Sequence, residues 1–166
     1  MRRRQLLVMG ALPMGLTARA VTLDVPEGPV VLTISGRVGH ANRGNAATFD
    51  MAMLARLPQS SITTRTPWFS QARKFTGPLL RDVLASVGVQ GEHLRAVALN
   101  DYRVDIPVED TQKFDVVLAT QIDDKPMSVR DKGPLFIIYP FDSHAALRNA
   151  LYFSRCAWQL KAIEVL

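Results

Sequence analysis

Few side chains in this sequence have the types and spacing that catalysis or metal binding requires. The three histidines, His40, His93 and His144, are far apart and show no i,i+4 spacing, so they do not predict a metal site. An acid, a serine and a histidine adjoin at 142–144, but chain neighbours lack the geometry of a catalytic triad. No glycine-rich phosphate loop is present. The sequence therefore offers no direct evidence for a hydrolase or a metalloenzyme.

Cys156 is the only cysteine, so the chain can form no internal disulfide. It lies in the run Phe-Ser-Arg-Cys-Ala-Trp, a context that favours a small buried apolar residue. A reactive thiol or a metal ligand is the weaker alternative. We expect Cys156 in the core.

The apolar periodicity predicts which elements position the remaining polar and aromatic side chains. Thr48 or Asp50 can cap the first helix, and Gly88 can end the second. Trp158 alternates with Leu160, which predicts that both belong to the core. Strands are expected at 30–38, 61–66, 94–99, 103–106, 116–121, 135–139 and 157–165, helices at 48–57 and 79–87, one or two helical turns at 144–151, and connectors at 67–74 and 108–114. Short strands with a few short helices indicate an α+β domain on mixed or antiparallel sheet.

The length of 166 residues, with 48% apolar and 21% charged residues, fits one domain with its own core. Residues 1–20 are typical of a secretory signal peptide: a basic start at 2–4, an apolar run at 6–16, and Ala-Arg-Ala at 18–20. The apolar run is too short to span the ~30 Å hydrocarbon core of a bilayer. The paired arginines also suit the twin-arginine route. We expect export to the periplasm and a single mature domain at 21–166.

Loss of the leader removes four arginines and no acidic residue, which lowers the net charge from +5 to +1. The basic character of the whole chain therefore belongs largely to the leader. It does not predict a nucleic-acid partner or binding to an acidic membrane.

The order and spacing of several short motifs carry more information than any one of them. The segment 75–84 reads Phe-Thr-Gly-Pro-Leu-Leu-Arg-Asp-Val-Leu, and Asn-Asp-Tyr stands at 100–102. A turn at 119–127 is followed by Gly-Pro-Leu at 133–135, and Trp-Gln-Leu-Lys begins the last strand at 158. Together these motifs resemble the sulfite-oxidase-type molybdopterin-binding domains, with the helix-start proline displaced by one position. The resemblance covers most of the chain after the leader and implies that family's α+β fold, with mixed sheets and a few short helices.

That family holds molybdenum through a cysteine at about the position of Arg65. An arginine is cationic and has no lone pair to donate, whereas molybdenum here needs a soft sulfur ligand. Cys156 lies in a different segment. The resemblance therefore implies an adapted pocket. The missing cysteine argues against bound molybdopterin and against enzymatic activity, and it decides neither question.

The resemblance implies a metal-free pterin as the ligand. The segments 139–142, 147–149 and 152–160 resemble small exported members of the fold, which bind free pterins and report them to a membrane-bound signalling enzyme that controls cyclic di-GMP. A pterin ring needs an aromatic face and polar groups at its edge. The ligand-binding residues that the resemblance implies are Arg65, Trp68, Phe69, Arg73, Asn100, Tyr102, Tyr139, Asp142, Arg148 and Arg155.

Several of these residues have ordinary structural alternatives. Trp68 can be a surface or core aromatic, and Arg65 can pair with an acid across a sheet. Tyr102 can be a packing residue in a turn, while Arg148 and Arg155 can be solvated charges. The sequence leaves both interpretations open.

The sequence thus predicts a periplasmic, non-catalytic pterin-binding module that reports its ligand to a membrane signalling protein with a periplasmic domain. Two alternatives remain. One is an oxidoreductase domain or subunit that holds molybdopterin through contacts other than cysteine. The other is a ligand-free protein-interaction domain of the same fold.

Overall fold

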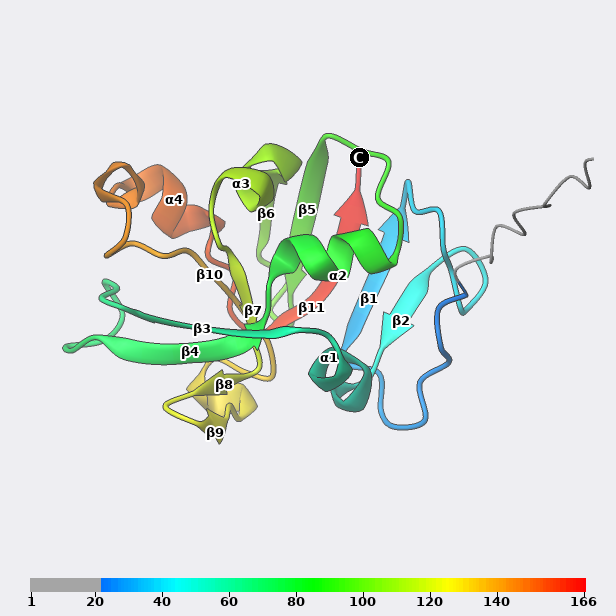
Figure 1. Ribbon diagram of the computed structural model, residues 1–166, viewed down its shortest axis with the longest axis horizontal. Coiled ribbons are helices and arrows are strands. Elements are labelled where there is room, and N and C mark those ends of the chain that lie inside the picture. Colours follow the sequence, from blue (N-terminus) through cyan, green and yellow to red (C-terminus); the bar gives the residue numbers. More distant parts are fainter. Residues whose placement is uncertain (1–21) are drawn as a thin grey trace, which may run out of the picture.

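Figure 1 shows the computed structural model of the protein, which describes residues 22–166. The signal peptide predicted at 1–20 lies outside this range. Between residues 22 and 166, no helix combines the length and apolar character that crossing a membrane would require. The described chain has the predicted α+β architecture, with three sheets and a few short helices.

The largest sheet has five strands in the order β2-β1-β11-β5-β6. Strands β1 and β11 are parallel, and the other neighbours are antiparallel. The last strand of the chain therefore lies at the centre of the sheet, with α2 across one face (Figure 1). The strands are β1 (Leu32–Gly36), β2 (Ala47–Phe49), β5 (His93–Ala98), β6 (Arg103–Pro107) and β11 (Leu160–Val165).

Two smaller sheets adjoin it. One has the order β3-β4-β8-β9, and the other pairs β7 with β10. Gly77 lies where β4 crosses β7, since a Cβ there would overlap the backbone carbonyl of Leu118. The strands are β3 (Gln59–Thr64), β4 (Arg73–Pro78), β7 (Val117–Ala119), β8 (Gln121–Ile122), β9 (Lys125–Pro126) and β10 (Phe136–Ile138).

The helices are short and several have defined caps. The Asp50 side chain accepts from the N–H of Met53 and caps α1. The Asn149 side chain accepts from the N–H groups of Leu151 and Tyr152 at the start of α4. The helices are α1 (Met51–Arg56), α2 (Leu80–Ser86), α3 (Val108–Lys113) and α4 (Ala150–Arg155), with 3-10 turns η1 (Val129–Asp131) and η2 (Ala145–Leu147).

Several predicted elements were wrong in extent or type. The connector expected at 108–114 contains the helix α3. Its N-cap residue, Pro107, has an extended backbone conformation. The helical turns expected at 144–151 continue through α4 to Arg155. Strand β4 was not predicted, because Arg73–Pro78 has little β-branched character and gains its stability by pairing with β3 and β8.

The core prediction holds for Cys156 and Leu160, which are buried, and was wrong for Trp158, which is only partly buried. Gln159 has φ of 51°, and a register shift follows between Leu160 and Ala162. This left-handed residue breaks the strand alternation from which the prediction was made. The Trp158 side chain lines a cavity while it packs against the buried core residue Phe136.

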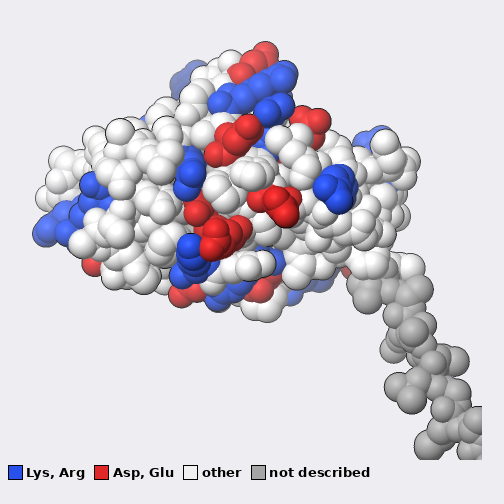
Figure 2. All heavy atoms as spheres, turned by 90° about the horizontal axis from the view of Figure 1, so that it is seen from above, with Lys and Arg blue, Asp and Glu red and all other residues white. Residues whose placement is uncertain are grey.

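The charged surface is mixed in sign. On the face in Figure 2, lysines and arginines lie among aspartates and glutamates. Ion pairs such as Arg95–Asp105, at 2.8 Å, and Arg81–Asp115, at 2.7 Å, contribute to this mixture.

Candidate functional site

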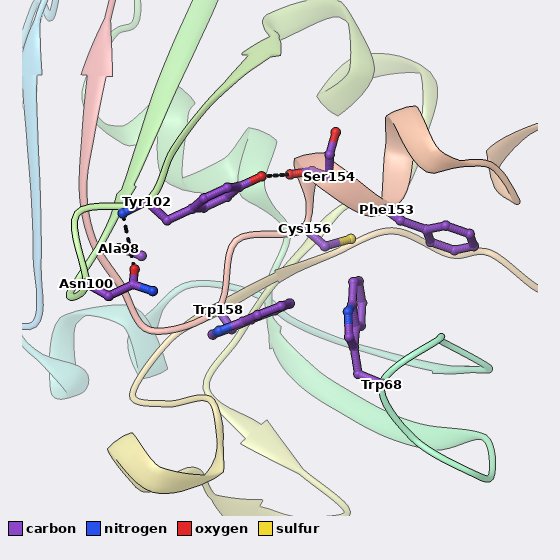
Figure 3. Close-up of a pocket in the computed structure, with 8 residues that line it drawn as sticks. All are labelled: Trp68, Ala98, Asn100, Tyr102, Phe153, Ser154, Cys156 and Trp158. Atoms are coloured by element: carbon purple, nitrogen blue, oxygen red, sulfur yellow. Dashed lines mark hydrogen bonds between the residues drawn. The ribbon is translucent and has the colours of Figure 1, made fainter.

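One cavity in the described part of the chain, called here the aromatic pocket, has a volume of about 320 Å³ and a largely apolar lining. Its walls come from the β3–β4 loop, the end of β5 with the β5–β6 turn, the end of α4 and the segment between α4 and β11 (Figure 3). Segments far apart in the sequence thus converge on one space. The lining residues are Trp68, Ala98, Asn100, Tyr102, Phe153, Ser154, Cys156 and Trp158.

The aromatic pocket has rings on several sides. Figure 3 shows Tyr102 on one side of the pocket and Trp158 on the opposite side, with Trp68 beside Trp158. The ring centroids of Trp68 and Trp158 are 5.3 Å apart at an interplanar angle of 71°. Trp68 also packs against Phe136 at 5.7 Å and Phe153 at 6.2 Å. These edge contacts hold Trp68 in one orientation and leave a space bounded by ring faces.

Tyr102 bridges two elements across the mouth of this pocket. Its backbone N–H donates to Asn100 Oδ1 at 3.1 Å in a turn where Asp101 has φ of 63°. Its hydroxyl donates to the backbone carbonyl of Ser154 at 2.8 Å (Figure 3). The β5–β6 turn is thereby connected to α4, although the Tyr102 side chain remains substantially exposed.

The aromatic pocket is lined almost entirely by apolar surface and has no fixed charge. Within residues 22–166, neither the Asn100 amide nitrogen nor the indole N–H of Trp68 or Trp158 has a hydrogen-bond acceptor. Burial raises the pKa of the Cys156 thiol well above its usual range, so the thiol is neutral. These walls suit an uncharged flat ring with acceptors on its edge.

Three other predicted site residues form a separate cluster. The backbone N–H of Arg65 donates to an Asp142 carboxylate oxygen at 3.0 Å, and Arg148 Nε donates to the Phe141 carbonyl at 2.9 Å. These residues line a cavity of about 240 Å³, which shares Phe153 with the aromatic pocket. The shared phenyl ring places this polar cluster next to the aromatic walls.

Phe69 and Arg73 lie elsewhere, in a depression of about 370 Å³ called here the basic pocket. The Arg73 guanidinium lies 5.2 Å from the Phe69 ring centroid and pairs with Asp123 at 2.9 Å. The chain neighbours Trp68 and Phe69 therefore line different pockets.

Tyr139 and Arg155 belong to a buried polar cluster. The Tyr139 hydroxyl donates to Asp110 Oδ2 at 2.9 Å, and Arg155 Nη1 donates to the same oxygen at 2.7 Å. Burial, followed by the charge of Asp110, raises the pKa of Tyr139 far above its usual range. Tyr139 is fully buried and lines none of the cavities described above. The bond between Asp110 and Arg155 joins α3 to the end of α4.

Sequence reasoning missed several walls of the aromatic pocket. Trp158 was assigned to the core, and Phe153 and Cys156 were not predicted to line a cavity. No local signal in the sequence identifies these residues. Their position depends on where α4 ends and on the left-handed backbone of Gln159.

The residues near Arg65 offer no soft ligand for a metal. Thr64 Oγ1 accepts from the N–H of Asp142 at 3.0 Å, and Thr66 Oγ1 is buried without a hydrogen-bond partner. These hydroxyls and the Arg65 side chain are not soft ligands, and the neutral Cys156 thiol lines a different cavity. Within residues 22–166, no cluster of three or more His, Cys, Asp or Glu side chains has a metal-binding arrangement. The donor set does not fit molybdenum held by a protein thiolate.

The three sheets and the short helices define an α+β domain with an aromatic cavity. Residues 30–145 match the family described as the oxidoreductase molybdopterin binding domain. This match covers well over half of the chain, and the chain belongs to that family. The expected resemblance to the sulfite-oxidase-type domains is thereby confirmed.

A solved structure has the same fold. The sulfane dehydrogenase SoxCD from Paracoccus pantotrophus superposes with a TM-score of 0.59 at 17% sequence identity. The match covers 81% of this chain and 37% of that chain, so the chain spans well under half the length of that relative. No curated protein sequence matches the chain. At this identity the structural likeness concerns the fold alone.

Proposed function

We propose that this family member binds a reduced pterin without metal in the aromatic pocket, as a non-catalytic module in the periplasm. The observation that carries the proposal is the aromatic pocket itself, where Trp68, Tyr102 and Trp158 surround a space of about 320 Å³. This volume lies at the lower end of small-molecule pockets, which span ~300–1,000 Å³. It suits one flat bicyclic ring.

The available polar groups suit a pterin edge. The Asn100 amide and the indole N–H groups can donate to ring nitrogens and to the ring carbonyl. The Tyr102 hydroxyl donates to Ser154 and keeps its lone pairs for a ring amine. Stacking on the aromatic walls adds ~1 kcal/mol beyond the burial of area.

The proposed reporting role rests on the resemblance of the segments 139–142, 147–149 and 152–160 to the small exported members of the fold. A ligand can shift a signalling partner only through different affinities for its two states. Tyr102 and α4 meet at the mouth of the aromatic pocket through the bond to Ser154. A ring that enters between them would alter the surface that a membrane partner contacts.

The ligand can be tested by anaerobic calorimetry of the exported protein with a tetrahydropterin. We expect saturable binding, and we expect Trp68→Ala to weaken it by at least about tenfold, the equivalent of ~1.4 kcal/mol. Phe69→Leu is the matched control, since Phe69 adjoins Trp68 in sequence but lines the basic pocket. Absence of pterin affinity in the folded protein would refute the proposal.

The second candidate is a molybdopterin-dependent oxidoreductase that holds the cofactor without a cysteine ligand. Membership of the family of oxidoreductase molybdopterin-binding domains favours it. Elemental analysis of protein purified from the periplasm separates the two candidates. Stoichiometric molybdenum would establish the second, whereas a retained pterin without metal supports the first.

A further inference from the structure

The basic pocket is a second candidate binding site with different chemistry. It lies between β4, the β8–β9 hairpin and the turn at 128–132. Four cationic side chains line it, from Arg73, Lys125, Arg130 and Lys132, together with one carboxylate, Asp131. The lining therefore carries an excess of positive charge in a concave surface.

Most of this charge has no internal partner. Only Arg73 is paired, with Asp123. Between residues 22 and 166, no carboxylate lies within 4.0 Å of the charged nitrogens of Lys125, Arg130 or Lys132. The neighbouring cations repel one another, so an anion placed among them would be stabilised by each.

The backbone holds this arrangement in place. Lys132 has φ of 72°, and its carbonyl accepts from the N–H of Gln159 at 2.9 Å. Gln159 Nε2 donates to the Val129 carbonyl at 2.6 Å, and Ser128 Oγ donates to Asp131 at 2.8 Å. The turn at 128–132 is thereby attached to the segment that leads into β11. An anion would meet donors whose backbone is already positioned.

Lys132 also connects this pocket to the aromatic pocket. Its Nζ lies 4.1 Å from the Trp158 ring centroid and 5.9 Å from that of Phe69. Lys132 lines the basic pocket, whereas Trp158 lines the aromatic pocket. An anion that draws Lys132 toward itself would weaken the cation–π contact with Trp158.

We propose that the basic pocket binds a phosphate group, and that Lys132 transmits its binding to Trp158. The cations from four positions suit a dianion better than chloride. The floor contains Phe69, Ile122, Pro126 and Met127, so a phosphate ester with an apolar group would gain contacts that free phosphate lacks. Phosphate binding here does not require a pterin in the aromatic pocket.

Calorimetry at constant ionic strength tests the site, with inorganic phosphate and phenyl phosphate as probes and chloride as the balancing anion. We expect saturable binding of both probes. Tighter binding of phenyl phosphate would assign the site to organic phosphate esters, and equal binding would assign it to free phosphate. Heats no different from those of the chloride control would overturn the proposal.

Exposed charge variants identify the pocket. Arg130→Gln combined with Lys125→Gln should weaken phosphate binding by at least about tenfold, since each removes a charge-assisted contact. Lys113→Gln is the control, because Lys113 pairs with Glu109 on α3 and lines none of the basic pocket. Equal binding by the double variant and wild type would place phosphate elsewhere and overturn the assignment.

Fluorescence tests the connection through Lys132. The chain has two tryptophans, Trp68 and Trp158, and both line the aromatic pocket. Phosphate should change the fluorescence emission of the two tryptophans over the same range of phosphate concentration in which calorimetry detects binding. Lys132→Met should remove that change. Binding with unchanged emission in wild type would overturn the role of Lys132.

Discussion

Individual residues with similar chemistry have different environments in this protein. Arg65 and Arg148 lie at a solvent-accessible cavity with Asp142, whereas Arg155 donates to the buried Asp110. The side-chain exposures of 15% for Arg155 and 9% for Asp110 mark the second pair as structural. A guanidinium in the sequence therefore does not by itself indicate a ligand contact.

The Asp110 cluster leads to a prediction about stability. Arg155→Leu should lower the free energy of unfolding by ~3–5 kcal/mol, because it leaves a buried carboxylate without its charged partner. Tyr139→Phe should cost less, ~1–2 kcal/mol, because only a neutral donor is lost. Urea unfolding checks both variants.

The double variant Arg155→Leu/Asp110→Leu controls for loss of packing. It should be more stable than Arg155→Leu alone, since no buried charge remains unpaired. If Arg155→Leu is as stable as wild type, the pair contributes nothing and Arg155 becomes available for another role.

At the scale of elements, short helices depend on side chains outside them. The carboxylate of Asp50 caps α1 through Met53 and also accepts from the N–H groups of Glu27 and Gly28, at 2.9 and 2.8 Å. One side chain thus attaches the segment before β1 to the start of a helix. An isolated helix of six residues would not be stable in water.

The Asp50 bonds predict a pH dependence. Hydrogen bonds from Gly28 and then Met53 hold the pKa of Asp50 below its usual range. The ionised group therefore adds stability above the unfolded pKa of ~3.9, and that stability is lost as pH falls through the lower folded pKa. Wild type should exceed Asp50→Asn in unfolding free energy at neutral pH, with a gap that narrows below about pH 4. A gap that is constant over this range in urea titrations would exclude the carboxylate's charge as the cause.

At the scale of the whole molecule, one hydrophobic core connects the three sheets. Buried side chains from β1, β4, β7, β10 and β11 belong to the same cluster, together with residues of α1 and α2. The close crossing of β4 and β7 at Gly77 is part of this packing. The sheets therefore depend on one another for burial.

The shared core predicts cooperative unfolding. Far-UV circular dichroism measures the secondary structure of the whole fold, whereas tryptophan fluorescence reports on the packing of Trp68 against Phe136. Both probes should give the same unfolding midpoint in urea if the core unfolds as one unit. Two separate midpoints would show that the small sheets unfold independently.

The sequence by itself determined the fold class and the family. Strands such as β1 and β5 follow from a local apolar alternation, and residue type offered Thr48 or Asp50 as the first helix cap, of which the structure uses Asp50. The resemblance identified the family because motif order survives where single positions change. Strand β4 and helix α3 could not be predicted, since residues distant in sequence contribute to their stability: β4 pairs with β8, and Asp110 on α3 accepts hydrogen bonds from Tyr139 and Arg155.

Only the tertiary structure decided which predicted site residues meet. It gathers Trp68, Asn100 and Tyr102 at the aromatic pocket, and it places Arg65, Asp142 and Arg148 in a neighbouring cavity. Phe69 and Arg73 lie in the basic pocket, whereas Tyr139 and Arg155 join the buried Asp110. The physical reason is that a pocket depends on backbone angles and long-range packing. The left-handed Gln159, which interrupts the alternation between Trp158 and Leu160, has no counterpart in the apolar pattern.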